Sequence, residues 1–80
     1  MTVRERLRPV FVKSLELEPE VDVERLEWRG HERWDSLGHL ALVAMIEDEF
    51  GVELDADQMI GLNSFERALE TLRDLGVDDD

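Results

Sequence analysis

The chain has 80 residues and a net charge of −12, so it is long enough for one small domain with a modest core. It contains no cysteine, which excludes disulfides, thiolate nucleophiles and cysteine-based zinc sites. Its longest apolar run, residues 40–46, is far shorter than the ~20 residues of a membrane-spanning helix, and its charged N-terminus lacks the apolar stretch of a signal peptide. We therefore expect a cytoplasmic protein that does not enter a membrane.

The charge is divided unevenly along the chain. Residues 1–34 carry seven basic and eight acidic side chains, a net charge of −1, whereas residues 35–80 carry two basic and thirteen acidic ones, a net charge of −11. Phosphate binding requires lysine and arginine, so the charge argues against a nucleic acid partner. An acidic half would instead attract basic protein surfaces.

The first predicted element is a helix from Thr2 to Leu17. Thr2 and Glu5 have the spacing of a capping box, and apolar residues recur at helical intervals after them. Pro9 lies inside this segment, where a proline removes a backbone donor and clashes with the preceding turn. We therefore expect a helix whose first half is disturbed.

Residues 18–34 show no sustained periodicity and contain Pro19 and Gly30, so they are predicted to form a long loop. Irregular segments of this length inside a small domain tend to be functional. We expect Trp28 to be buried and to pin the loop to the helices.

Residues 35–51 form the strongest predicted helix, because Asp35 is a favourable N-cap and Gly51 a favourable terminator. At about 100° per residue, two apolar arcs lie on opposite sides of this helix. The arc predicted to face the core contains His39, Leu42, Val43, Ile46 and Phe50. The opposite arc contains Leu37, Leu40, Ala41 and Ala44, and it either forms a docking surface or is covered by the long loop through Trp34 or Leu26.

Two further helices are predicted. Asp55 and Gln58 form a capping box that opens a short helix at residues 56–62, and Asn63 and Glu66 form another that opens residues 64–75. The predicted fold is all-α: a monomeric four-helix bundle with three main helices and one short helix. We expect residues 1–77 to form the single domain and residues 78–80 to form a disordered acidic tail. The predicted core consists of Leu7, Phe11, Leu15, Trp28, Leu42, Val43, Ile46, Phe50, Phe65, Leu69 and Leu72.

The sequence offers no catalytic arrangement, and we expect neither an enzyme nor a metal site. His39 is on the same helix as Ser36 but about 60° away around the wheel, so we interpret it as a core residue. The paired carboxylates lack the spacing of a calcium-binding loop. What remains is Ser36 at the first turn of a helix, accessible to another enzyme, where a phosphodiester would meet the positive end of the helix dipole.

Three stretches resemble the acyl carrier protein family. These are Asp35-Ser36-Leu37, the run from Leu42 to Leu54 that includes Phe50-Gly51, and Asn63-Ser64-Phe65-Glu66. Length, charge and the order of helices fit as well, so the resemblance covers about residues 3–77. It implies that Ser36 carries 4′-phosphopantetheine, transferred from coenzyme A by a magnesium-dependent phosphopantetheinyl transferase.

The resemblance also implies the chemistry and the partners. The thiol of the arm would hold an acyl or aminoacyl group as a thioester, which explains why the chain needs no cysteine of its own. The transferase would recognise Asp35 and Leu37. Glu47 and Asp48 would meet basic residues on loading and acyl-processing enzymes, beside the stripe of Leu37, Leu40, Ala41 and Ala44.

Departures from the family pattern suggest a particular branch. Arg33 replaces the glycine that usually stands two residues before the aspartate, and Gly38, His39 and Ala41 stand where the fatty-acid type tends to have acids. The local sequence around Ser36 resembles that of stand-alone carriers of specialised, polyketide-like or other secondary pathways. An aminoacyl or peptidyl carrier, or a carrier-like interaction domain that is never modified, remain as alternatives.

Overall fold

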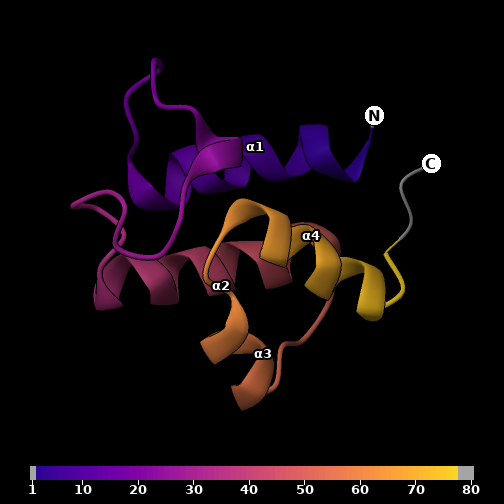
Figure 1. Ribbon diagram of the computed structural model, residues 1–80. Coiled ribbons are helices and arrows are strands. Elements are labelled where there is room, and N and C mark those ends of the chain that lie inside the picture. The colour runs from indigo at the N-terminus through magenta and orange to yellow at the C-terminus, as the bar shows by residue number, and fades with distance from the viewer. Residues whose placement is uncertain (1, 78–80) are drawn as a thin grey trace.

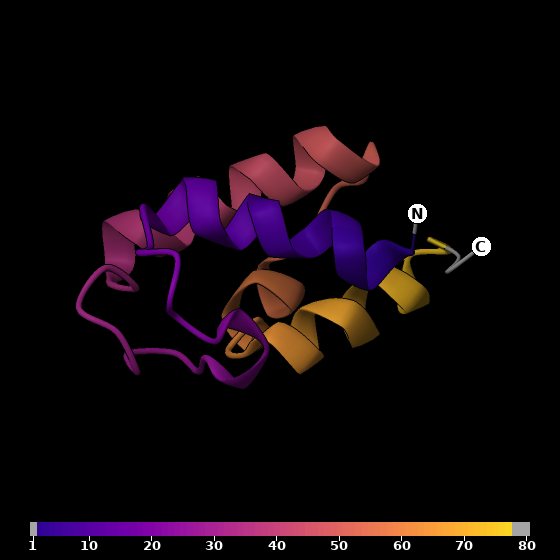
Figure 2. The same cartoon turned by 90° about the horizontal axis from the view of Figure 1, so that it is seen from above.

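Four helices with capped ends build the structure, a computed structural model that describes residues 2–77. They are α1 (Val3–Leu15), α2 (Ser36–Phe50), α3 (Ala56–Gly61) and α4 (Phe65–Asp74), and the α1–α2 loop contains a 3₁₀ turn, η1 (Val23–Arg25). α1 and α2 run antiparallel, and α4 lies along the other side of α1 (Figures 1 and 2). The predicted all-α fold with three main helices and one short helix is confirmed.

Two further predictions concern the acidic tail and membrane insertion. The acidic tail predicted at residues 78–80 lies outside the described residues. Within residues 2–77, no helix is both long and apolar enough to cross a membrane.

The capping box predicted for α1 is confirmed. The Thr2 hydroxyl accepts a hydrogen bond from the Glu5 amide at 3.1 Å, and the Glu5 carboxylate accepts one from the Thr2 amide at 3.2 Å. The hydrogen bonds that the Thr2 amide and the Thr2 hydroxyl donate to the Glu5 carboxylate lower the pKa of the Glu5 carboxyl. The predicted disturbance at Pro9 is wrong, because α1 is continuous from Val3 to Leu15. Pro9 is exposed, so water can reach the backbone carbonyl that loses its partner there.

The prediction that Trp28 is buried in the core is wrong, and the buried tryptophan of the loop is Trp34. Trp34 is fully buried, and its ring meets the edge of Phe11 at a centroid distance of 5.5 Å. Phe11 in turn contacts Phe65 of α4 at 5.2 Å. Trp28 is 37% exposed and lies against the outside of Trp34, with the ring centroids 6.2 Å apart. The loop has no sequence periodicity, so the sequence alone does not indicate which tryptophan is buried.

The remaining core predictions are largely confirmed. Phe50 is the other exception: it is only partly buried, and the Arg6 guanidinium lies 4.6 Å above its ring. The predicted residues that are buried are Leu7, Phe11, Leu15, Leu42, Val43, Ile46, Phe65, Leu69 and Leu72. Buried residues that the prediction omitted include Leu17, Val23 and Leu26 of the loop, and Leu54 and Leu62 on either side of α3.

The start of α4 is displaced by one residue from the prediction. Ser64, not Asn63, is the N-cap, and its hydroxyl accepts a hydrogen bond from the Arg67 amide at 3.0 Å. The Asn63 carbonyl is instead engaged with the long loop, where it accepts a hydrogen bond from the Trp28 amide at 2.7 Å. This pairing with the loop outweighs the local capping signal. The capping box of α3 is confirmed, with Asp55 and Gln58 bonded reciprocally.

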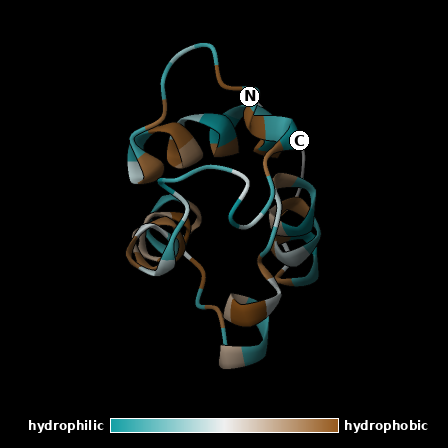
Figure 3. Cartoon of the chain, turned by 60° about the vertical axis from the view of Figure 1, so that its left-hand side comes forward, coloured by the Kyte–Doolittle hydropathy of each residue, from teal (hydrophilic) through white to brown (hydrophobic). Residues whose placement is uncertain are grey.

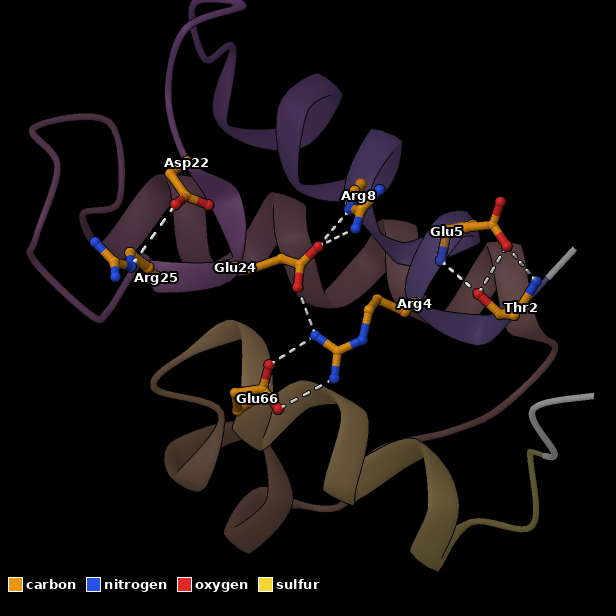
Figure 4. A network of polar contacts seen from close by, with 8 residues as sticks. All are labelled: Thr2, Arg4, Glu5, Arg8, Asp22, Glu24, Arg25 and Glu66. Atoms are coloured by element: carbon orange, nitrogen blue, oxygen red, sulfur yellow. Dashed lines mark hydrogen bonds and ion pairs between the residues drawn. The ribbon is translucent and has the colours of Figure 1, made fainter.

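A charged network ties the long loop to α1 and α4 (Figure 4). Glu24 of η1 accepts hydrogen bonds from Arg4 and Arg8, each at 2.6 Å, and Arg4 also reaches Glu66 of α4 at 2.8 Å. The two guanidinium groups, Arg8 foremost, lower the pKa of the Glu24 carboxyl. Solvent-accessible ion pairs contribute only about 0–1 kcal/mol each, so the network orients the loop more than it stabilises the fold.

The two tryptophans should respond differently to truncation. Trp34→Ala should cost about 3–5 kcal/mol because it empties the centre of the core, and a domain with about 5 kcal/mol of stability would largely unfold. Trp28→Ala removes a partly exposed ring and should be tolerated. Urea unfolding followed by circular dichroism measures both. Equal losses in the two variants would contradict the assignment of Trp34 as the central core residue.

Candidate functional site

Ser36 is the first residue of α2 and is exposed at the end of the bundle where α1 finishes and α2 begins (Figure 1). Its neighbour Asp35 is the N-cap, and the Asp35 carboxylate accepts a hydrogen bond from the Gly38 amide at 2.9 Å. Because Asp35 performs the capping, the Ser36 hydroxyl is not engaged in a hydrogen bond within residues 2–77. The serine is therefore accessible to an external reagent.

The turn that precedes Ser36 lies directly on the first turn of α2. The Trp34 amide donates to the His31 carbonyl at 3.0 Å, and the His31 Nδ1 accepts from the Arg33 amide at 3.1 Å. A Cβ atom at Gly38 would lie 2.1 Å from the Arg33 carbonyl oxygen. Glycine at this position is thus what allows the backbone before Ser36 to approach the helix so closely.

Grooves lie on both sides of this end of α2. The groove toward α1 has a volume of about 300 Å³, and its lining includes Arg33, Leu37 and Ala41. The groove toward α3 has a volume of about 220 Å³ and is lined by Trp28, His39, Ile60, Leu62 and Asn63. The serine lies on the ridge between them, since Leu37 and His39 fall on opposite sides of Ser36 around the helix.

The second apolar stripe of α2 is a surface feature. Leu37 is 78% exposed and Leu40 is 63% exposed, while Ala41 and Ala44 are also exposed. The alternative that the long loop covers this stripe is contradicted, because Trp34 and Leu26 are buried in the core cluster. Hydrophobic residues accordingly surround much of α2 in Figure 3, which views the molecule from the side where α2 begins.

The two acidic residues predicted to meet partners are placed differently. Asp48 is exposed. Glu47 is half-buried, and its carboxylate accepts a hydrogen bond from the Leu54 amide at 2.9 Å. Glu47 therefore fixes the loop between α2 and α3, a role that the sequence did not reveal.

His39 is half-buried rather than part of the buried core, and both of its ring nitrogens have partners. Its Nδ1 accepts a hydrogen bond from the Trp34 indole at 3.0 Å, and its Nε2 lies 2.8 Å from the Met59 carbonyl oxygen. Both ring nitrogens are engaged, so His39 does not serve Ser36 as a base. Within residues 2–77, no cluster of three or more histidine, aspartate or glutamate side chains has a geometry that could hold a metal ion.

Residues 5–72 match the family described as the phosphopantetheine attachment site. A comparison with solved structures found none that matches the chain.

Gly38 provides a test of the geometry around Ser36. Gly38→Ala should force the Arg33 carbonyl and the following turn away from α2, because the added methyl group has no room. We expect a loss of about 1–3 kcal/mol in the free energy of unfolding and a change in tryptophan fluorescence as Trp34 shifts. Ala41→Gly, at an exposed position of the same helix, is the control for helix propensity and should leave the fluorescence unchanged. Wild-type fluorescence and stability in Gly38→Ala would show that the close approach is not required.

Proposed function

Because the chain belongs to the phosphopantetheine attachment family, whose members bind 4′-phosphopantetheine covalently, we propose that Ser36 is its attachment residue. The observation that carries the proposal is the exposed Ser36 hydroxyl, which is released from capping by Asp35. Asp35 and Leu37, the residues on either side, are both exposed and available to a phosphopantetheinyl transferase.

The residues around Ser36 fit a phosphodiester. Ser36 and Leu37 belong to the first turn of α2, whose amides have no partners within the helix, and the helix dipole places partial positive charge there. A phosphate on the serine would thus be favoured where it is attached.

The arm supplies a thiol that this cysteine-free chain lacks, and that thiol would hold an acyl or aminoacyl group as a thioester. The chain itself would contribute attachment, presentation and recognition rather than catalysis. This function is that of an acyl carrier protein, which delivers its cargo to partner enzymes.

Partner enzymes would dock on α2. The stripe of Leu37, Leu40, Ala41 and Ala44 offers an exposed apolar surface next to the serine, and Asp48 adds negative charge further along the helix. Desolvated apolar contacts carry most of the affinity of an interface, whereas charges at its rim govern encounter. Glu47 would add to the negative field although its carboxylate also holds the Leu54 amide.

The apolar start of α2 supports a specialised biosynthetic pathway rather than housekeeping fatty-acid synthesis. The first turn of this helix contains no acidic residue, so the exposed surface that follows Ser36 along α2 begins with the apolar side chains of Leu37 and Leu40. Partners would therefore need an apolar contact opposite Leu37 and Leu40, with basic groups only toward Asp48.

Mass spectrometry tests the attachment residue. Incubation with coenzyme A, magnesium and a broad-specificity phosphopantetheinyl transferase should add the mass of one phosphopantetheine to the wild type and nothing to Ser36→Ala. Ser14→Ala is the matched control and should be modified normally, while circular dichroism should show all three proteins folded. A mass gain in Ser36→Ala would refute the assignment, and no gain in the wild type would favour an unmodified interaction domain.

The docking surface can be tested with Ala44→Glu and Asp48→Lys, using the rate of modification at low and high salt. Asp48→Lys should slow modification severalfold at low salt and little at high salt, because salt screens exposed charges beyond about 10 Å. Ala44→Glu should impair modification at both salt concentrations, since it places a charge in the apolar contact. Asp74→Lys makes the same charge change on α4 and controls for net charge. Unfolding of Ala44→Glu, or equal effects of Asp48→Lys and Asp74→Lys, would contradict this docking surface.

A further inference from the structure

The short helix α3 is held in place from outside itself. It has six residues, none of them fully buried, and its Ile60 is 80% exposed. The buried residues are Leu54 before it and Leu62 after it. Fully buried side chains thus anchor the two flanks of α3, whereas the helix between them packs against the core only through the partly buried Met59.

The one hydrogen bond that joins α3 to α2 within residues 2–77 is made by His39. Its Nε2 lies 2.8 Å from the carbonyl oxygen of Met59, and its Nδ1 lies 3.0 Å from the Trp34 indole nitrogen. An indole N–H can only donate, so Nδ1 must be the acceptor and carry no proton. The neutral ring then carries its proton on Nε2 and donates it to Met59.

Trp34, His39 and Met59 form a hydrogen-bonded relay, and its two ends, Trp34 and Met59, differ in freedom of movement. Trp34 is fully buried and surrounded by the rings of Phe11 and Trp28, so it cannot follow a moving partner. Met59 is only partly buried and belongs to a helix that has no fully buried residue. His39 therefore connects a fixed point in the core to a helix that could move.

The geometry points to His39 as a latch that holds α3 against α2. With the latch closed, the imidazole ring forms one wall of the groove that Trp28, Ile60, Leu62 and Asn63 complete. Release of the Met59 carbonyl would let α3 swing about its flanks at Leu54 and Leu62 and widen that groove. The latch does not depend on the attachment at Ser36, so it is tested in the unmodified protein.

Two substitutions of His39 each remove one hydrogen bond of the relay and keep the other. Asparagine places its side-chain oxygen near the position of Nδ1, so His39→Asn keeps an acceptor for Trp34 but cannot reach Met59. Glutamine is one methylene longer and places its amide near Nε2, so His39→Gln keeps a donor for Met59 but loses the acceptor for Trp34. Ser14→Ala is the matched control, because it removes a side-chain hydrogen bond to the Phe11 carbonyl in α1, away from α3.

Amide hydrogen exchange measured by NMR reports directly whether α3 is held against α2. In His39→Asn the amides of residues 59–62 should exchange about tenfold faster, the effect expected for the loss of one hydrogen bond, while those of α1 stay at the wild-type rate. In His39→Gln the amides of α3 should keep their protection, and the Trp34 indole proton should exchange faster. Ser14→Ala should leave α3 unchanged.

The opposite patterns in the two variants are the signature of a latch. Wild-type exchange of α3 in His39→Asn, or equal acceleration in α1 and α3, would overturn the proposal, because the latter is what a merely structural role produces. If either variant fails to fold, the nitrogen shifts of the His39 ring in the wild type decide. A proton on Nε2 supports the relay, and a proton on Nδ1 refutes it.

Discussion

The complete burial of Trp34 is the constraint on which the rest of the structure depends. A buried indole N–H must find an acceptor, and here the acceptor is His39 on the first turns of α2. The ring also contacts Phe11 of α1, so a residue of the long loop joins α1 and α2. Because Trp34 is two residues before Ser36, its fixed position sets where the loop ends and where α2 begins.

The local signals in the sequence predicted the helices well. The caps Thr2, Asp35 and Asp55 are all confirmed, because a cap depends only on residues within one turn. Apart from the disturbance wrongly predicted at Pro9, the errors arose where contacts between distant residues decide the structure. Asn63 lost the capping role at α4 because its carbonyl pairs with Trp28 of the loop, and Trp28 and Trp34 could not be distinguished without knowing what surrounds them.

The candidate site shows the same division. The sequence predicted the exposed position of Ser36 and the apolar stripe beginning at Leu37, because both follow from helical periodicity and the position of a cap. It could not predict that Glu47 holds the Leu54 amide, that Gly38 lies under the Arg33 carbonyl, or that His39 reaches Met59. Each of these contacts joins separate segments, and nothing in the local pattern specifies them.

The arginines of α1 have a consequence for how copies of the protein meet. Arg4, Arg6 and Arg8 are all paired with carboxylates of the same chain, on Glu24, Glu49 and Glu66. Few unpaired basic groups then remain on a molecule with a net charge of −12, so identical copies repel one another at low ionic strength. Exposed leucines on a neutral surface would favour self-association. Here the repulsion between copies leaves the apolar stripe of α2 exposed to solvent. It also favours contact with partner surfaces that carry positive charge.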